Sequence, residues 1–268
     1  MRLFIVPLVL LPAIVCLADA PIPREVDHWL IQKPPKEDSQ AWNAANRSEY
    51  EWQVAEENGR VVASNLPGGP AKQPALPFKL QPSNPKARLH ALQVDDGWLI
   101  GSDAGEWGGE LAWYSADGKR TYPIIRGNIH CVQRTKLGVV AVRGLAHLTM
   151  NDGDLLRLRR ARTDRWIAES IVDLKSAPYA MTTERDGSLI IVTSRTLLRV
   201  DLDSHARVLV KGAFWWGMYP NSIVETANGD IYLGMRHGVA RVRAAGRPAA
   251  VDWLLPNREF VNATPAIP

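Results

Sequence analysis

The chain has 268 residues, a formal net charge of +4 and only two cysteines, with positive and negative residues interspersed along its length. Such a mild charge does not indicate a nucleic-acid-binding protein, and no stretch after residue 20 is apolar enough to span a bilayer. We therefore expect no nucleic acid partner and no membrane span, while the oligomeric state stays open.

The first twenty residues, 1–20, predict a secretory signal peptide. Arg2 supplies the positive start, an apolar stretch follows, and Ala18-Asp19-Ala20 provides the small residues that a signal peptidase reads. A retained membrane anchor is disfavoured by two prolines in the apolar stretch. A lipoprotein signal at Cys16 is disfavoured by Val15, where a very small side chain is needed. We expect an exported protein, periplasmic or extracellular, whose fold begins at Pro21.

Residues 21–86 are predicted to form an N-terminal arm, a linker and a partial blade. Proline and polar residues dominate 21–48 and 65–86, but residues 50–63 contain two short apolar runs around Asn58-Gly59. Asn-Gly reaches positive φ readily and is typical of a tight β-hairpin. This hairpin could supply a fifth blade or complete the last one, and an arm that joins the C-terminal blade would close a ring.

A repeat occupies residues 87–256, before a short C-terminal tail at 257–268. Each repeat has a first strand, a Gly-containing turn, a nearly continuous apolar second strand, an alternating third strand and a fourth strand. The spacing of roughly 40–50 residues is typical of four-stranded propeller blades. The four segments that align with one another are 87–125, 128–174, 178–210 and 221–255.

The turns recur in phase in these repeats. Asp96-Gly97, Asp186-Gly187 and Asn228-Gly229 are predicted to join first and second strands, because these dipeptides close tight hairpins cheaply. Asp117-Gly118 and Asp152-Gly153 are predicted to follow third strands, the latter as the end of the third segment of its repeat, 145–153. We therefore predict an all-β chain that forms a small propeller of four-stranded blades, about five or else six. A β-sandwich would leave the in-phase turns unexplained.

Stability must come from the core. After signal cleavage Cys131 is the one remaining cysteine, so no intrachain disulfide can form, and ten tryptophans supply the apolar area. The basic run Leu155–Arg162 alternates partly with leucine, which favours a strand with one solvated face. Contact with nucleic acid, anionic lipid or cell-wall polymer is the alternative interpretation.

One loop is longer than its counterparts in the other repeats. Gly105-Glu106-Trp107-Gly108-Gly109 inserts an acid and an indole between glycines at the second-to-third turn. Loops on a rigid scaffold often carry function. Glu106 is therefore a candidate acceptor or metal ligand and Trp107 a candidate stacking surface. A structural plug, with Trp107 covering the core, is the equal alternative.

The segment before the fourth repeat is rich in aromatic residues. Two adjacent tryptophans in a loop cannot both face one core, so at least one of Trp215 and Trp216 is expected at the rim, near Tyr219. Asn221, at the start of an inner strand, could face the central channel. The alternative is that both tryptophans pack between blades and Asn221 makes a turn hydrogen bond.

No short motif identifies an enzyme or a metal site. His130 is expected in an inner strand, and His147 and His237 beside second-to-third turns, but no His or Cys spacing typical of zinc is present. Nucleophile-elbow, P-loop and dinucleotide-binding motifs are also absent from the sequence. A lone strand histidine is more often structural, so the sequence leans away from catalysis and predicts no cofactor.

The blade pattern over 87–255 resembles that of bacterial propellers of the NHL, TolB-like and senescence-marker/gluconolactonase group. In gluconolactonase-like enzymes a Glu, an Asn and an Asp in the channel hold a divalent cation. The step Pro220-Asn221 is similar to the Asn-bearing step of that family, Glu106 would stand in for the acid, and the Asp has no counterpart. This resemblance implies a possible cation bound by Glu106 and Asn221.

Three functional hypotheses follow. The first is an exported, non-catalytic propeller that binds a peptide, glycan or protein partner through its loop-rich face. The second is a cation-dependent hydrolase or lactonase, and the third is a periplasmic inhibitor or immunity protein. The candidate ligand-binding residues are Glu106, Trp107, Trp215, Trp216, Tyr219 and Asn221.

Overall fold

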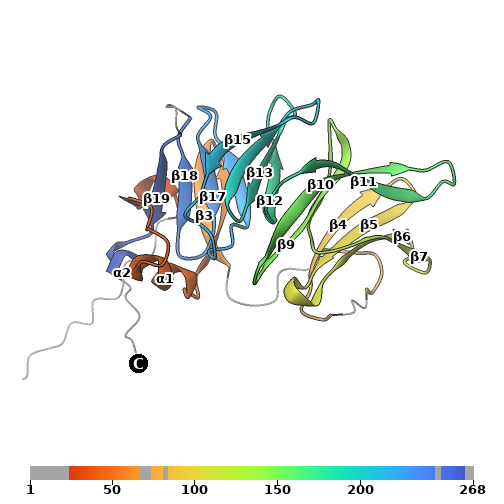
Figure 1. The fold of residues 1–268 in the computed structure, drawn as a ribbon, viewed down its shortest axis with the longest axis horizontal. Coiled ribbons are helices and arrows are strands. Elements are labelled where there is room, and N and C mark those ends of the chain that lie inside the picture. Colours follow the sequence, from red (N-terminus) through yellow and green to blue (C-terminus); the bar gives the residue numbers. More distant parts are fainter. Residues whose placement is uncertain (1–23, 67–73, 81–83, 245–248, 263–268) are drawn as a thin grey trace, which may run out of the picture.

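The computed structural model describes residues 24–66, 74–80, 84–244 and 249–262, and the signal peptide predicted at 1–20 lies outside these residues. The described chain is a series of antiparallel sheets that follow one another in sequence order, as the change from yellow to blue in Figure 1 shows. The predicted all-β propeller fold is confirmed. Within the described residues no helix has the length and apolar character needed to cross a bilayer.

Four sheets are up-and-down meanders of consecutive strands. The first contains β4 (Arg88–Val94), β5 (Gly97–Asp103), β6 (Glu110–Ser115) and β7 (Thr121–Arg126). The second contains β8 (Ile129–Thr135), β9 (Gly138–His147), β10 (Met150–Arg160) and β11 (Trp166–Asp173). The third contains β12 (Pro178–Thr183), β13 (Leu189–Thr193), β14 (Thr196–Val200) and β15 (Ala206–Lys211). The fourth contains β16 (Ser222–Glu225), β17 (Ile231–Gly234), β18 (Val239–Val242) and β19 (Val251–Leu255).

The N-terminal arm completes the fourth sheet and adds a fifth, smaller one. Strand β1 (Leu30–Gln32) pairs antiparallel with β19, so the first described strand joins the last. Strands β2 (Glu51–Glu57) and β3 (Arg60–Leu66) form a two-stranded sheet that packs beside β16 and β17. Asn58 and Gly59 have φ of 52° and 76°, as the predicted Asn-Gly turn requires. The hairpin is thus a reduced fifth blade and not part of the last one.

Four short helical segments complete the described chain. They are η1 (Val26–His28), α1 (Gln40–Asn46), η2 (Gly105–Trp107) and α2 (Arg258–Asn262). The first strands of neighbouring sheets touch in the order β4, β8, β12, β16 and β2. Each first strand therefore lies beside the next in this order, and all five begin at the same end of the sheets.

The second blade differs from the predicted one. Strand β9 extends to His147, the turn lies at Leu148 and Thr149, and β10 begins at Met150, so the third strand predicted at 145–153 is wrong. Asp152-Gly153 lies inside β10 and is not a turn. Gly153 pairs with Gly144, and a Cβ on either would come within 2.5 Å of Pro178 Cδ. These glycines permit the close approach of the third blade, which local turn chemistry does not reveal.

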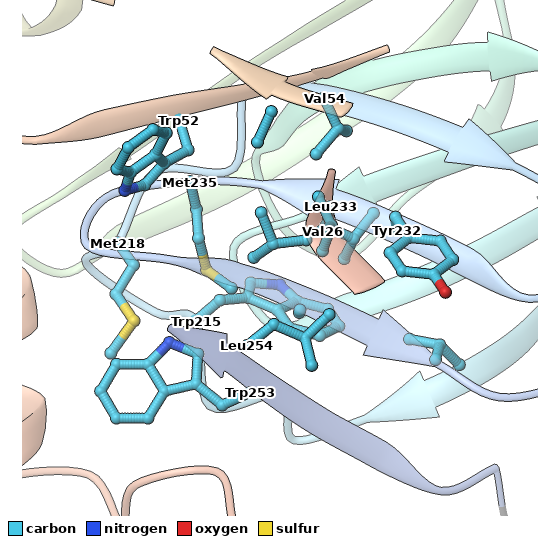
Figure 2. Close-up of a cluster of buried hydrophobic side chains, with 14 of the residues drawn as sticks. Val26, Trp52, Val54, Trp215, Met218, Tyr232, Leu233, Met235, Trp253 and Leu254 are labelled. Carbon is cyan, nitrogen blue, oxygen red and sulfur yellow. The ribbon is translucent and has the colours of Figure 1, made fainter. Parts of the chain in front are cut away.

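The second strands are buried on both faces, as predicted. Leu189–Val192 of β13 are each 0 % exposed, because the strand is packed between neighbouring sheets. The largest core cluster joins the fourth blade, part of the third blade and the β2–β3 hairpin, and Trp52, Trp215, Met218 and Trp253 belong to it (Figure 2). Burying a large apolar side chain contributes about 1.5–3 kcal/mol. This cluster therefore holds the N-terminal hairpin to the repeats.

Candidate functional site

A cavity of about 580 Å³ lies where the innermost strands begin, and we call it the axial cavity. Glu51 and Arg88 are the first residues of β2 and β4, and His130 and Tyr179 are the second residues of β8 and β12. Because side chains alternate between the faces of a strand, one position near each strand start points toward the axis. The repeated blade thus brings together residues that are far apart in sequence.

A histidine and a carboxylate lie close together in the cavity wall. His130 Nδ1 is 3.2 Å from Asp103 Oδ2, and His130 Nε2 is 3.0 Å from the carbonyl oxygen of Gly144. Burial alone would raise the pKa of Asp103, but the His130 ring and the Gly105 N–H, which donates to its carboxylate, lower this pKa to about 2. Asp103 is therefore a permanent anion, and both ring nitrogens of His130 face acceptors.

A second histidine lies close to this pair. Burial is the main effect that lowers the pKa of His90 to about 4, and the charges of His130 and Arg88 lower it further. Its Nε2 is buried and has no hydrogen-bond partner among the described residues. At neutral pH His90 is thus an uncharged imidazole, and it adds no positive charge to the cavity.

Three cationic side chains line the axial cavity. Arg88 has its Nη2 atom 3.8 Å from Glu51 Oε1, at the far limit of an ion pair. Arg236 donates from Nη1 to the carbonyl oxygen of Asn46 at 3.0 Å and lies over the Tyr219 ring at 4.5 Å. Lys86 lies on the segment that leads into β4. The wall therefore presents positive charge that its own acids do not fully neutralise.

Aromatic side chains form the other part of the wall. Tyr179 and Tyr219 have ring centroids 5.8 Å apart, and Tyr219 is 44 % exposed. Burial, with the charge of Tyr219 as a smaller cause, raises the pKa of Tyr179 well above its ordinary value, so its phenol stays protonated. Trp107 reaches the rim from η2 and is 75 % exposed. These rings offer flat surfaces beside a neutral O–H donor.

The inserted loop lies at this rim. Gly105 and Gly108 have φ of 60° and 83°, which lets the chain enter and leave the single turn of η2. Glu106 Oε2 lies 3.4 Å from His147 Nε2, so this acid is paired with the β9 strand of the next blade. Because Trp107 is exposed, it does not cover the core as a plug would.

The aromatic segment before β16 is divided between core and surface. Trp215 is fully buried, and its Nε1 donates to the carbonyl oxygen of Thr193 at 2.9 Å. Trp216 is half-buried, with the Arg195 guanidinium 4.4 Å from its ring centroid. Tyr219 and Pro220 line the axial cavity. Trp215 is therefore a core residue, while Tyr219 is exposed in the wall of the axial cavity.

Asn221 is oriented toward the N-terminal hairpin. Its Nδ2 donates to Glu51 Oε1 at 3.2 Å, and its Oδ1 is buried without a partner among the described residues. Glu106 and Asn221, the pair that would hold a cation, thus have different partners, His147 and Glu51 respectively. His237 is buried, and its Nε2 donates to the Phe260 carbonyl oxygen, 2.8 Å away, as a structural residue does.

Sequence reasoning missed several residues of the axial cavity. They are Glu51, Lys86, Arg88, Asp103, Tyr179 and Arg236. A usable pattern existed for two of the cavity residues, because His130 and Tyr179 are both the second residues of the first strands in successive aligned repeats, whereas Arg88 lies one place earlier in its strand. Arg236 and Glu51 carry no such pattern, since one lies in a turn and the other in the hairpin outside the repeats.

Comparisons with known proteins identify no family. No family model matches the chain, and no curated protein matches it. A virginiamycin B lyase from Staphylococcus aureus aligns with a TM-score of 0.41 and 16 % identity over 62 % of this chain and 54 % of the lyase. The chain thus spans about half the length of that lyase.

Two further solved structures are similar to the same degree. YCF48 bound to D1 peptide aligns with a TM-score of 0.38 and 11 % identity, over 91 % of this chain and 75 % of that one. A protein of unknown function from Bacteroides caccae aligns with a TM-score of 0.39 and 10 % identity, over 76 % and 73 %. Likenesses this distant say nothing of activity. The order of its own strands makes this chain a β-propeller.

Proposed function

We propose that this chain is a non-catalytic binding propeller whose peptide, glycan or protein ligand occupies the axial cavity. One observation carries the proposal. A cavity of about 580 Å³ combines exposed rings at its rim, Trp107 and Tyr219, with cationic side chains in its wall. Its volume falls within the roughly 300–1,000 Å³ of ordinary ligand sites, and exposed aromatic residues are typical anchors of interfaces.

The absence of catalysis is supported by the state of the titratable groups. A general base needs a nitrogen or oxygen within reach of the substrate proton. Both nitrogens of His130 already face acceptors, and the low pKa of Asp103 makes its carboxylate a weak base. A wall that holds its charges fixed is suited to binding, because it does not have to exchange protons with a substrate.

Peptide and glycan arrays would test the proposal. The purified protein should bind at least one class of probe, and Trp107→Ala should weaken that binding because it removes the most exposed ring at the rim. Leu202→Ala is the matched control, since Leu202 is an exposed apolar residue on the β14–β15 turn at the other end of the blades. Equal binding by wild type and Trp107→Ala to every probe would refute the axial cavity as the binding site.

We further propose that the protein is exported and that residues 1–20 are removed. The positive start, apolar stretch and Ala18-Asp19-Ala20 motif support this. Expression with the native N-terminus in a Gram-negative host, followed by intact-mass measurement, should give a chain that begins at Pro21 in the periplasmic fraction. A full-length chain retained in the cytoplasm would contradict export.

A further inference from the structure

Several arginines outside the axial cavity pair closely with carboxylates of the protein itself. Arg143 pairs with Asp154, with Nη2 and Oδ2 2.8 Å apart. Arg241 pairs with Asp252 at 2.6 Å. A guanidinium that already has a close carboxylate has little left to offer a ligand. Arg143 and Arg241 are therefore poor candidates for binding an anionic ligand.

The cavity cations lack close carboxylate partners. Arg88 has one at 3.8 Å, too long for a hydrogen bond, and its side chain is 45 % exposed. In the part of the chain that the structure describes, Arg236 and Lys86 have no carboxylate within ion-pair distance. The Arg236 guanidinium is instead held by the Asn46 carbonyl oxygen and the Tyr219 ring. Its remaining N–H groups keep their capacity to donate.

The acids of the cavity are already engaged. Asp103 accepts from the Gly105 N–H and pairs with His130. Glu51 accepts from the Asn221 amide at 3.2 Å and is shared with distant Arg88. The wall is therefore left with excess positive charge in a concave site. Such a site favours an anion, and two guanidinium groups favour the planar, bidentate geometry of a carboxylate.

The rim beside these cations is apolar in a way that suits a peptide. Leu145 and Ala146 of β9 line the cavity, and the strand continues to the turn at Leu148. Leu148 is 87 % exposed and Met150 is 50 % exposed. Aliphatic side chains match the side chains of a peptide better than the hydroxyl groups of a sugar. Beside them, the protonated Tyr179 hydroxyl is a further donor.

We propose that the axial cavity binds a carboxylate of a peptide ligand, held by Arg88 and Arg236, with the ligand's apolar side chains on Trp107 and Leu148. The inference rests on the proposed binding function and specifies its ligand class. The carboxylate is either the C-terminus of the peptide or an Asp or Glu side chain, because both present the same two oxygens. The guanidinium groups bind it by charge-assisted hydrogen bonds.

The experiment uses the full chain and short random-sequence peptides as the probe. Each peptide is synthesised with a free C-terminal carboxylate, as the C-terminal amide, and with its Asp and Glu replaced by Asn and Gln. Titration calorimetry on the best binders should show that loss of one kind of carboxylate weakens binding by at least about tenfold, the equivalent of one charge-assisted hydrogen bond. The peptide form that binds more weakly, the C-terminal amide or the Asn/Gln form, identifies which carboxylate the cavity binds.

Variants then assign the effect to the cavity. Arg88→Gln should weaken the carboxylate form by about tenfold and leave the amide or Asn/Gln form unchanged, while Arg88→Lys should restore part of the binding. Arg159→Gln is the matched control, because Arg159 has a similarly exposed side chain but pairs with Glu169 on the β10–β11 surface. Melting temperatures of all variants show whether each is folded.

Three outcomes overturn the inference. Peptides that bind equally in all three forms, yet lose affinity with Trp107→Ala, would disprove the carboxylate and leave the binding function standing. Binding of acidic oligosaccharides in place of peptides would disprove the ligand class. Equal losses of peptide affinity in Arg159→Gln and Arg88→Gln would show that the positive charge of the whole protein, and not the cavity, attracts the peptide. Failure of the proposed binding function would give a different result: no probe would show binding that is weakened by Trp107→Ala.

Discussion

The two ends of the central channel differ in how their charges are used. At the axial cavity, Arg88 and Arg236 face open space with no carboxylate within hydrogen-bond distance. At the other end, where the innermost strands finish, Glu184 follows β12 and Glu225 ends β16. There Arg199 is 2.5 Å from Glu184 and 2.8 Å from Asp186. At the acidic end, Glu184 and Asp186 thus have a close cationic partner, whereas at the cationic end Arg88 has only a long ion pair.

This difference shows which end is available for function. Charges that satisfy one another stabilise the fold, whereas charges that remain open in a concave site attract a ligand. The carboxyls of the acidic end also affect each other, since burial and the nearby Glu225 charge raise the pKa of Glu184 to about 7. The same strands thus carry an end whose ion pairs are structural and, by our proposal, an end that binds a ligand.

The largest expected effect concerns the buried tryptophan of the aromatic segment before β16. Trp215→Ala should lower the free energy of unfolding by about 3–5 kcal/mol, because it opens a cavity in the core and removes the hydrogen bond to the Thr193 carbonyl oxygen. Trp107→Ala should change it by less than about 0.5 kcal/mol, since that ring is mostly in solvent. Urea denaturation measures both. Similar losses in the two variants would mean that Trp107 is a core residue.

A pair of arginine variants tests the contrast directly. Arg199→Gln should cost about 1–3 kcal/mol of unfolding free energy at pH 8, where it leaves a buried, ionised Glu184 without its cation. Arg88→Gln should cost less than about 0.5 kcal/mol, because its ion pair is long and exposed. Chemical denaturation at constant ionic strength compares them. Equal costs would remove the distinction between a structural and a binding end.

The pH dependence of stability at the acidic end follows from Glu184. Its pKa is about 7 in the folded chain and 4.5 in a model carboxyl, so between these values the folded state holds more protons than the unfolded state. Unfolding free energy should therefore fall as pH rises from 4.5 to about 7. Glu184→Gln should flatten this part of the profile. An unchanged slope in the variant would assign the dependence to another group.

The cationic end should give the opposite slope over a similar range. The pKa of His90 is about 4 in the folded chain against 6.5 in a model imidazole, so the unfolded state binds the extra proton. Its contribution to stability is complete above pH 6.5 and is lost as pH falls toward 4. His90→Phe keeps an aromatic ring and should remove this decline in denaturation series at several pH values. A steeper acid decline in His90→Phe would contradict the assignment.

The smallest expected effect is at the rim. Glu106→Gln should change unfolding free energy by less than about 0.5 kcal/mol, because the pair with His147 is exposed on both sides. Melting temperatures of wild type and variant in calcium, zinc or manganese should coincide, as a binding propeller without a metal requires. A clear rise for wild type alone would favour the cation-dependent hydrolase and make Glu106 its ligand.

Local chemistry made much of the fold predictable. Gly59, Gly118 and Gly229 occupy tight turns with positive φ, and Leu189–Val192 of β13 are all apolar, so strand boundaries and buried strands can be read from short stretches. The added length of the Gly105–Gly109 loop also marked Trp107, which lies at the rim of the axial cavity. In the second blade the same rules failed. Gly153 there permits close packing against Pro178, which is distant in sequence.

The cavity could be predicted only in part. The place of His130 and Tyr179 in their repeats follows from the alignment, but their neighbours Glu51 and Arg236 come from a hairpin and a turn. Adjacent Trp215 and Trp216 look equivalent in sequence, and packing alone decides that the first is buried and the second is not.

The sequence by itself determined the repeated blade, its turns and its buried strands, because each depends on backbone preferences and on hydrophobic alternation over a few residues. Tertiary structure decided that the N-terminal strand β1 pairs with β19 and that Arg88, Asp103 and Arg236 share one cavity. These contacts join residues far apart in the chain. They depend on the packing of whole sheets around an axis, which no short stretch encodes.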